Sequence, residues 1–215
     1  MHDRVTTVIF CKPLARAKRR LAGRFAPADR AALVRAMLTD VIEAAGAASA
    51  LGPILLCTGD PELGALAEQR GAEWLLDPGD DDLNRAARAA RQLACDRGVR
   101  ALLLLPADLP CVTAEDLDRL AQLGPAAAVR ARDGGTNALL IDPRAPFGFR
   151  FGPHSFEAHG AAARRGGQRL QCLLGGGLVD DLDTPQMVDR LAPARVAPRT
   201  AAFLAQSRPP FGRVA

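Results

Sequence analysis

Short apolar runs alternate with longer helical segments along most of this chain, and this alternation restricts its fold more than any other feature. The runs VTTVIF, PILLCT, EWLL and ALLLL have the length and the β-branched or leucine-rich character of buried strands. Strands that are separated by helices build parallel sheets with helices on both faces. The sequence therefore predicts an α/β fold in which helices flank a mostly parallel, mixed central sheet.

The individual elements can be placed from periodicity and turn residues. We expect strands at residues 5–10, 53–58, 73–76, 101–105, 126–132 and 136–141, and a further short strand at 149–151. We expect helices at about residues 27–46, 61–70, 83–96, 114–122 and 155–165, and a closing helix after Pro185. The first helix has apolar side chains at helical spacing, namely Leu33, Val34, Met37, Leu38, Val41 and Ile42.

The chain shows no internal repeat and no linker, which indicates one domain. Its 215 residues, 48% of them hydrophobic, can bury a sizeable core. We assign residues 1–195 to this domain and residues 196–215 to a Pro/Arg-rich C-terminal tail, whose end we expect to be loosely ordered. No apolar run reaches the ~18 residues of a membrane span and no signal peptide is evident, so we expect a cytoplasmic protein. Five widely spaced cysteines without a C-x-x-C pair argue against disulfides and a zinc site.

Arginine and lysine are used very unevenly. The net charge is +4, but the arginines are interleaved with acidic residues, so a solvated basic face is favoured over nucleic-acid binding. Of 28 basic residues only Lys12 and Lys18 are lysines, and both lie in the loop CKPLARAKRRLAG after the first strand. Such a loop can offer ammonium and backbone N–H groups to a phosphate chain. The alternative is a solvated basic loop, since the sequence has neither a P-loop nor a G-x-G-x-x-G fingerprint.

The central apolar run ends in a carboxylate, Asp108, in the stretch LLLLPADLP. Ligands of open α/β sheets lie just outside the carboxyl ends of such strands, although an aspartate there can also cap a turn. A second carboxylate is available at Asp181 or Asp183 in DDLDTP, and Mg²⁺ is usually held by one or two carboxylates. The alternative for this second motif is that Asp183 or Thr184 caps the closing helix.

Two further stretches could approach a ligand. In RDGGTNALL, Gly134 and Gly135 allow close backbone approach, or simply form a hairpin turn. In FGPHSFEAH, Ser155 is a good helix N-cap, and a helix N-terminus attracts anions. We expect His159 to be a surface residue of that helix rather than a catalytic base.

Six stretches resemble one family in content and in order. KPLARAKRRLAG, LNRA, PADLP, DGGTNALL, FGPHSFEAH and DLDTP follow one another as in the phospholactate guanylyltransferases of coenzyme F420 biosynthesis, a deazaflavin pathway. The resemblance covers about residues 5–191, and GGTNAL followed by FGPxSFxxH is its most specific part. It implies a single-domain, Rossmann-like nucleotidyltransferase fold of the nucleotide-diphospho-sugar transferase type.

The resemblance also implies an activity. Members transfer GMP from GTP to 2-phospho-L-lactate, phosphoenolpyruvate or 3-phospho-D-glycerate, and pyrophosphate leaves. Lys12, Lys18 and Asp108 would be the catalytic residues, with the two lysines holding the triphosphate. Asn84 would lie near the nucleoside, and Asp108 with Asp181 would bind Mg²⁺.

The acceptor side is implied by three other matching positions, Thr136, Gly152 and Ser155. Backbone N–H and hydroxyl donors there would receive the small phospho-acid. The sequence leaves open which of the three acids is used, whether a homodimer forms and whether the product passes directly to the next enzyme.

Other functions are compatible with the same residues. One is a molybdenum-cofactor-type nucleotidyltransferase that uses CTP or a pterin acceptor, although a pterin needs a broader pocket than a three-carbon acid. A non-catalytic GTP-binding module and a sugar-nucleotide glycosyltransferase are the others. The small acceptor is favoured by GGTNAL together with FGPHS.

Overall fold

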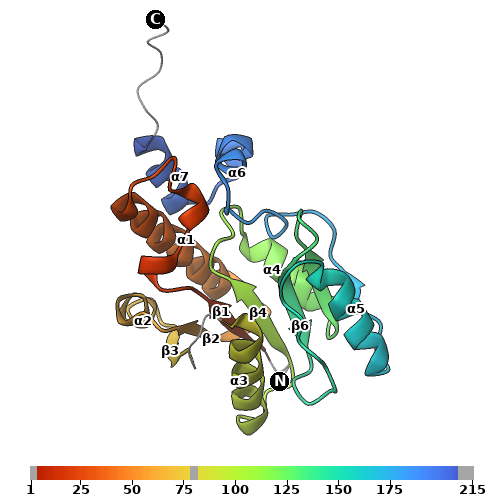
Figure 1. Cartoon of the computed structure of the whole chain (residues 1–215). Helices are drawn as coiled ribbons and strands as arrows, with labels where there is room; N and C mark the ends of the chain where they lie inside the picture. The colour runs from red at the N-terminus through yellow and green to blue at the C-terminus, as the bar shows by residue number, and fades with distance from the viewer. Residues whose placement is uncertain (1–3, 78–81, 208–215) are drawn as a thin grey trace, which may run out of the picture.

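A seven-stranded sheet with the strand order β3-β2-β1-β4-β6-β5-β7 forms the middle of the molecule (Figure 1). The computed structural model describes residues 4–77 and 82–207. Its strands are β1 (Val5–Phe10), β2 (Leu51–Thr58), β3 (Glu73–Leu76), β4 (Leu102–Pro106), β5 (Ala127–Arg130), β6 (Thr136–Ile141) and β7 (Gln171–Cys172). Only β6 is antiparallel to its neighbours among these strands. The prediction of a mostly parallel, mixed sheet is confirmed.

Helices cover both faces of this sheet. They are α1 (Pro27–Ala47), α2 (Pro61–Glu68), α3 (Leu83–Asp96), α4 (Ala114–Gln122), α5 (Ser155–Arg165), α6 (Pro185–Arg190) and α7 (Pro198–Gln206). Short 3₁₀ turns occur at η1 (Leu14–Arg16), η2 (Arg19–Leu21) and η3 (Pro193–Arg195). None of the helices within the described ranges is long and apolar enough to cross a membrane.

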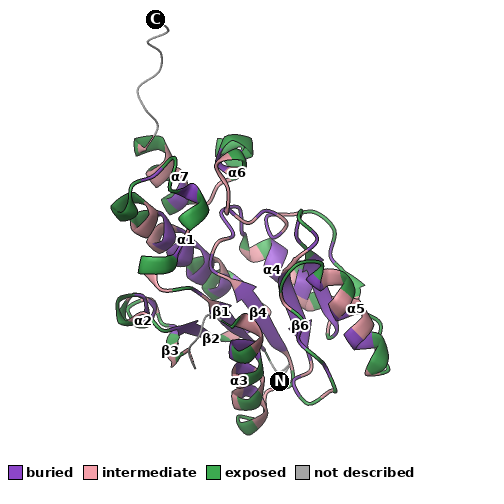
Figure 2. Ribbon diagram, in the orientation of Figure 1, coloured by how far each residue is buried: buried purple, intermediate pink, exposed green. Residues whose placement is uncertain are grey.

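The core divides into two clusters because side chains alternate between the faces of each strand. Ile9, Leu56 and Leu103 point toward the face covered by α1 and α4. Their neighbours Val8 and Leu104 point to the opposite face, where they pack on small alanines of α3 and α5. Figure 2 shows the result, with buried strands in the middle and the exposed surface on the outer sides of the helices.

One expected strand is absent. Residues 149–151 are not a strand, because side chains rather than a neighbouring strand take up their backbone groups. The Asn84 side chain bonds both the N–H and the carbonyl of Phe151 (2.7 and 3.0 Å), and the N–H of Arg150 donates to His159 (3.0 Å). The short strand β7 was not predicted.

The C-terminal region contains a helix that the sequence did not predict. Helix α7 lies beside α1 in Figure 1, and its first turn is held by the carboxylate of Asp40, a buried residue of α1. Asp40 accepts from the N–H groups of Arg199 (3.1 Å) and Thr200 (2.8 Å) and from the Thr200 hydroxyl (2.7 Å). The end of the tail, residues 208–215, where loose order was expected, lies outside the described residues.

Asp40→Ala is expected to lower the free energy of unfolding by about 3 kcal/mol, because three donors at the start of α7, two of them buried, lose a charged acceptor. Urea unfolding measures the change, and limited proteolysis within residues 198–206 reports the release of the helix. Asp96→Ala, which removes an exposed carboxylate bonded to Gln92, is the control. Equal stability of the two variants would contradict this role of Asp40.

Candidate active site

A cavity of about 430 Å³ opens where the parallel strands end. Phe10, Cys57 and Pro106, at the carboxyl ends of β1, β2 and β4, line it together with residues of the β1–α1 loop and of α3. The chain proceeds from β1 toward β3 on one side and resumes at β4 on the other side of β1. Such a reversal between adjacent strands is the ligand-binding position of open α/β sheets.

Two of the predicted residues meet at this position. The ammonium of Lys18 donates to Asp108 (2.5 Å) and to Asp183 (2.6 Å), and the Lys18 side chain is only 6% exposed. Lys18 has a left-handed backbone conformation (φ 52°), which directs the turn between η1 and η2. The loop that carries Asp181 and Asp183 is held in place because the N–H of Leu182 donates to the carbonyl of Asp108 (3.0 Å).

The charges in this cluster are strongly coupled. Burial works to lower the pKa of Lys18, but attraction to Asp108 and Asp183 outweighs it and raises that pKa. Burial works to raise the pKa of Asp183, while Lys18 lowers it below its usual value. Burial and repulsion from Asp108 and Asp183 raise the pKa of Asp181 to about 6. Arg20 lies 4.0 Å from Asp183 and also lowers the pKa of that carboxyl. The pKa of Asp181 is raised in spite of these cations, so a further cation beside Asp181 would be stabilised.

The second carboxylate motif also settles an alternative. Thr184, not Asp183, is the N-cap of α6, and its hydroxyl accepts from the N–H of Met187 (3.4 Å). Pro185 occupies the first helical position, as expected. Asp183 is thus available to Lys18.

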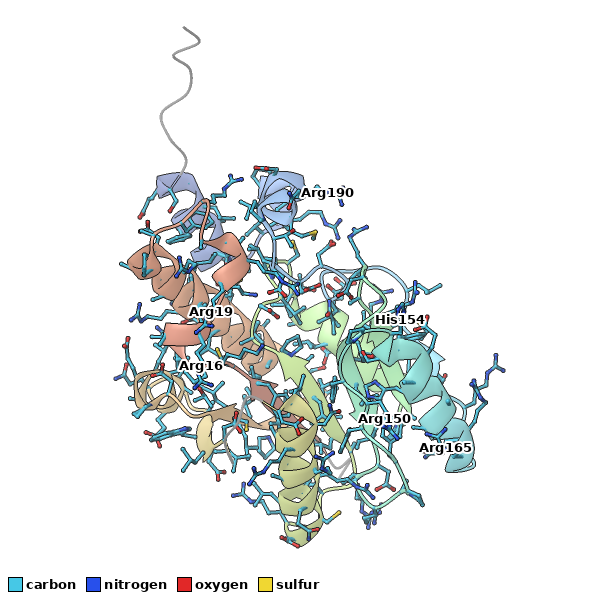
Figure 3. All side chains as sticks on the ribbon, in the orientation of Figure 1. Arg16, Arg19, Arg150, His154, Arg165 and Arg190 are labelled. Carbon is cyan, nitrogen blue, oxygen red and sulfur yellow. The ribbon has the colours of Figure 1, made fainter. Side chains whose placement is uncertain are left out.

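Lys12 lies on the same cavity and is exposed. Arg16, Arg19 and Arg20 line it as well, and all three belong to the β1–α1 loop; Figure 3 labels Arg16 and Arg19. The cavity therefore has a basic rim over an apolar floor. Such a combination suits an anionic chain attached to a flat ring.

Two cysteines also line the cavity. Burial and the nearby Asp108 raise the pKa of Cys11 to about 12, and burial and Asp77 raise that of Cys57 to about 12. Both thiols are therefore protonated at neutral pH. Because the thiolate is the nucleophilic form, neither is suited to covalent catalysis.

The predicted nucleoside contact, Asn84, does not line this cavity, although its helix neighbours Leu83 and Ala86 do. Its amide is used in two hydrogen bonds to the backbone of Phe151. The structure thus places Asn84 as a link between the start of α3 and the segment that leads into FGPHSFEAH.

The predicted acceptor residues gather at the same end of the sheet, where β4 ends and β6 begins. Because β6 is antiparallel, its first residue, Thr136, lies at the edge where β4 ends and Asp108 follows; the register pairs Leu104 with Leu139. The Ser155 hydroxyl donates to the Thr136 hydroxyl (3.1 Å). Gly152 has φ 135°, and its carbonyl accepts from the N–H of Ser155 (3.1 Å).

Two sequence expectations about this segment are wrong. Ser155 is not the N-cap of α5 but its first residue; His154 is at the cap with φ 57°, and the Ser155 hydroxyl turns toward Thr136 instead. His159 is not on the surface but is fully buried. It packs against the rings of Phe147 and Phe151. Its neighbours in the sequence, Ala158 and Gly160, are small and do not indicate that it is buried.

Sequence reasoning overlooked Asn137. Its buried amide donates to the carbonyls of Leu178 (3.0 Å) and Val179 (3.1 Å). The start of β6 is thereby tied to the segment that precedes Asp181 and Asp183. The signal available in the sequence was an amide side chain inside an otherwise apolar strand, because a buried amide needs hydrogen-bond partners.

Three carboxylates of this region are candidate ligands for a divalent cation. Asp108, Asp181 and Asp183 supply oxygen ligands of the kind that Mg²⁺ prefers. Within residues 4–77 and 82–207, however, no three His, Cys, Asp or Glu side chains are arranged to enclose a metal ion. The residues fit an ion that is shared with substrate phosphates, which is how Mg²⁺ is commonly bound.

Two solved structures follow a similar chain path. One from Desulfovibrio desulfuricans, assigned provisionally to the nucleotide-diphospho-sugar transferases, has a TM-score of 0.73 at 20% identity and covers 94% of each chain. A nucleotidyl transferase from Methanothermobacter has a TM-score of 0.63 at 14% identity and covers 95% of this chain and 99% of that one. These likenesses establish the fold as the nucleotide-diphospho-sugar transferase type.

Sequence relatives are more specific. A phosphoenolpyruvate guanylyltransferase from Sphaerobacter thermophilus is 40% identical over 189 residues, 86% of this chain and 91% of that protein. A 3-phospho-D-glycerate guanylyltransferase from Phenylobacterium zucineum is 37% identical over 195 residues, 87% and 89% of the two chains. The family model described as guanylyl transferase CofC like matches residues 5–186. By fold, by relatives and by this match, the chain belongs to the CofC-like guanylyl transferases and is a nucleotidyltransferase.

Proposed function

We propose that this enzyme transfers GMP from GTP to a small phosphorylated three-carbon acid and releases pyrophosphate, as a step of coenzyme F420 biosynthesis. The observation that carries the proposal is the arrangement of residues where β4 ends and β6 begins. There the Lys18–Asp108–Asp183 cluster lies at the end of β4, and the Thr136–Ser155 hydroxyl pair lies at the adjacent start of β6. A basic cavity for a nucleotide thus adjoins hydroxyl donors for a second anion.

In this proposal the nucleotide occupies the cavity. The nucleoside lies over the apolar floor at Leu83, Ala86 and Pro106, and the triphosphate meets the exposed Lys12 of the basic rim and the buried Lys18 of the same cavity. Asn84 does not line the cavity; its amide holds the backbone of Phe151 at the start of α3, beside the cavity residues Leu83 and Ala86. Ammonium groups suit a phosphate chain because they act as compact point charges.

The phospho-acid binds at Thr136, Gly152 and Ser155. Its phosphate oxygen attacks the α-phosphorus of GTP; a new P–O bond forms, the bond to the bridging oxygen breaks, and pyrophosphate leaves with the electron pair. The two reactants are both anions, so their alignment and the neutralisation of their charge are the main tasks of the protein.

Asp108 and Asp181 would hold Mg²⁺, with Asp183 as the alternative second ligand. The raised pKa of Asp181 supports a cation in this place. When bound, Mg²⁺ neutralises phosphate charge and orients the reacting groups. Lys18 keeps Asp108 and Asp183 at a fixed separation.

The test is pyrophosphate release from GTP and Mg²⁺ with phosphoenolpyruvate, 2-phospho-L-lactate and 3-phospho-D-glycerate in turn. Pyrophosphatase and the next enzyme of the pathway are added so that product does not accumulate. We expect turnover with one acid and a preference for GTP over CTP. The acids named for the two relatives make phosphoenolpyruvate and 3-phospho-D-glycerate the first to assay.

Other outcomes would favour the rival functions. Preference for CTP with a pterin acceptor would favour the molybdenum-cofactor type. Tight GTP binding without pyrophosphate release from any acid would favour a binding module. Consumption of a nucleotide sugar would favour a glycosyltransferase.

A further inference from the structure

His159 is a buried, chemically versatile residue that the proposed reaction does not use. It lies on α5, four residues after Ser155, and its side chain is fully buried. The Phe151 ring meets it edge-on at 4.8 Å between centroids, and the Phe147 ring lies at 5.7 Å. Figure 3 labels Arg150 and His154, which lie in the segment that leads into this helix.

Its hydrogen bonds determine which ring nitrogen carries the proton. The N–H of Arg150 donates to Nε2 (3.0 Å), and a backbone N–H can only donate, so Nε2 has to accept. Burial lowers the pKa of His159 to about 4, which leaves the ring neutral at physiological pH. The single ring proton is therefore on Nδ1, and Nδ1–H donates to the Thr136 hydroxyl oxygen (3.0 Å).

Because of this donation, neither hydroxyl group can donate its own proton to His159. The Thr136 and Ser155 oxygens are 3.1 Å apart and share one hydrogen bond. In the structure Ser155 donates to Thr136, and the Thr136 proton is left over. With the opposite direction the Ser155 proton would be left over instead. Because His159 cannot accept at Nδ1, the pair has one O–H that can donate to a bound ligand in either case.

We infer that His159 is a positioning residue for acceptor binding, which orients the Thr136–Ser155 hydroxyl pair so that one O–H donates to an anionic oxygen of the phospho-acid. This inference rests on the proposed acceptor role of Thr136 and Ser155. His159 does not contact the substrate itself. It also holds the N–H of Arg150, and the adjoining Phe151 is held by Asn84, so the lead-in to Gly152 is fixed from both sides.

Two substitutions separate positioning from simple structural support. His159→Asn places an amide donor near the Nδ1 position and keeps the bond to Thr136, but it loses the acceptor for Arg150. His159→Gln reaches the Nε2 position and keeps the acceptor for Arg150, but it loses the donor to Thr136. We expect similar losses of thermal stability in the two variants, because each keeps one of the two buried bonds.

Kinetics should distinguish them. In pyrophosphate-release assays, His159→Gln and His159→Leu should raise the KM for the acid about tenfold and leave the KM for GTP within about twofold. His159→Asn should stay within about threefold of the wild type for both. In a Thr136→Val background, His159→Leu should add no further increase in the acid KM, because the hydroxyl through which it acts is absent.

Equal kinetic defects in His159→Asn and His159→Gln, a parallel rise in the KM for GTP, or additive effects in the double variant would overturn the inference while leaving the proposed function standing. If the wild type neither turns over nor binds any of the three acids by calorimetry, the proposed function fails, and this inference fails with it.

Discussion

Asp108→Ala is expected to lower kcat/KM for GMP transfer by on the order of 10³-fold while the fold is retained. Asp108 follows the central strand β4, accepts from Lys18 at 2.5 Å and is the common member of the proposed metal pair. The variant loses a cation ligand at the point where two anions meet. The fold should survive because the Asp108 side chain is 25% exposed and Lys18 keeps Asp183 as a partner.

The measurement is the initial rate of pyrophosphate release at several Mg²⁺ concentrations, with thermal unfolding as a check on the fold. Asp189→Ala is the matched control, since it removes a carboxylate that is 64% exposed and pairs with Arg24 outside the cavity. The control should retain wild-type kinetics. A folded Asp108→Ala enzyme with kcat/KM within threefold of the wild type would remove Asp108 from the catalytic residues.

The parts of the fold that were predictable have local signals. The bounds of α3, α4 and β6 agree with the expected ranges. Asp82 and Thr113 cap the two helices with their own side chains, and both residues are adjacent to the helix in sequence. Alternation and helical periodicity are likewise local patterns, so a single sequence contains them.

The parts that were missed depend on distant partners. The acceptor for the first turn of α7 is Asp40, 160 residues before Thr200 in the chain. The lost strand at 149–151 is held by Asn84, 67 residues before Phe151. The pattern along the chain contains neither contact, so the sequence predicts a tail in place of α7 and a strand at residues 149–151.

The site shows the same division. The two lysines and Asp108 were conspicuous by composition and by their place after strands, and the structure joins Lys18 to Asp108. The arrangement of the second carboxylate motif, DDLDTP, could not be predicted from the sequence, because it depends on the hydrogen bond from the Leu182 N–H to the Asp108 carbonyl. That bond brings Asp183 to Lys18, whereas the sequence left Asp181, Asp183 and a helix cap as alternatives.

Lys18→Met is expected to lower kcat/KM by about 10²-fold or more and also to reduce stability, in contrast to Lys12→Met. The Lys18 ammonium separates two carboxylates, and without it Asp108 and Asp183 repel each other in a partly buried place. Because Asp183 is 43% exposed, water screens part of this repulsion, and we expect a stability loss of about 2 kcal/mol. Lys12 lines the cavity, so its replacement should raise the KM for GTP. Because Lys12 is exposed, the same replacement should have little effect on the free energy of unfolding.

The pH dependence of this stability difference follows from the direction of the pKa shifts. The pKa of Asp183 is lowered from its usual 3.8, so the stabilisation from its pairing is present above that pH and is lost on further acidification. The pKa of Lys18 is raised from its usual 10.5, so the stabilisation is present below that pH and is lost only in stronger alkali. Between about pH 6 and pH 10.5 the melting temperatures of the wild type and Lys18→Met should differ by a nearly constant amount. The gap should begin to narrow near pH 6, where Asp181, whose charge Lys18 also stabilises, becomes protonated, and it should narrow further below about pH 4 as Asp183 follows. A gap that is unchanged on acidification would show that Lys18 stabilises the fold through its packing rather than through its charge.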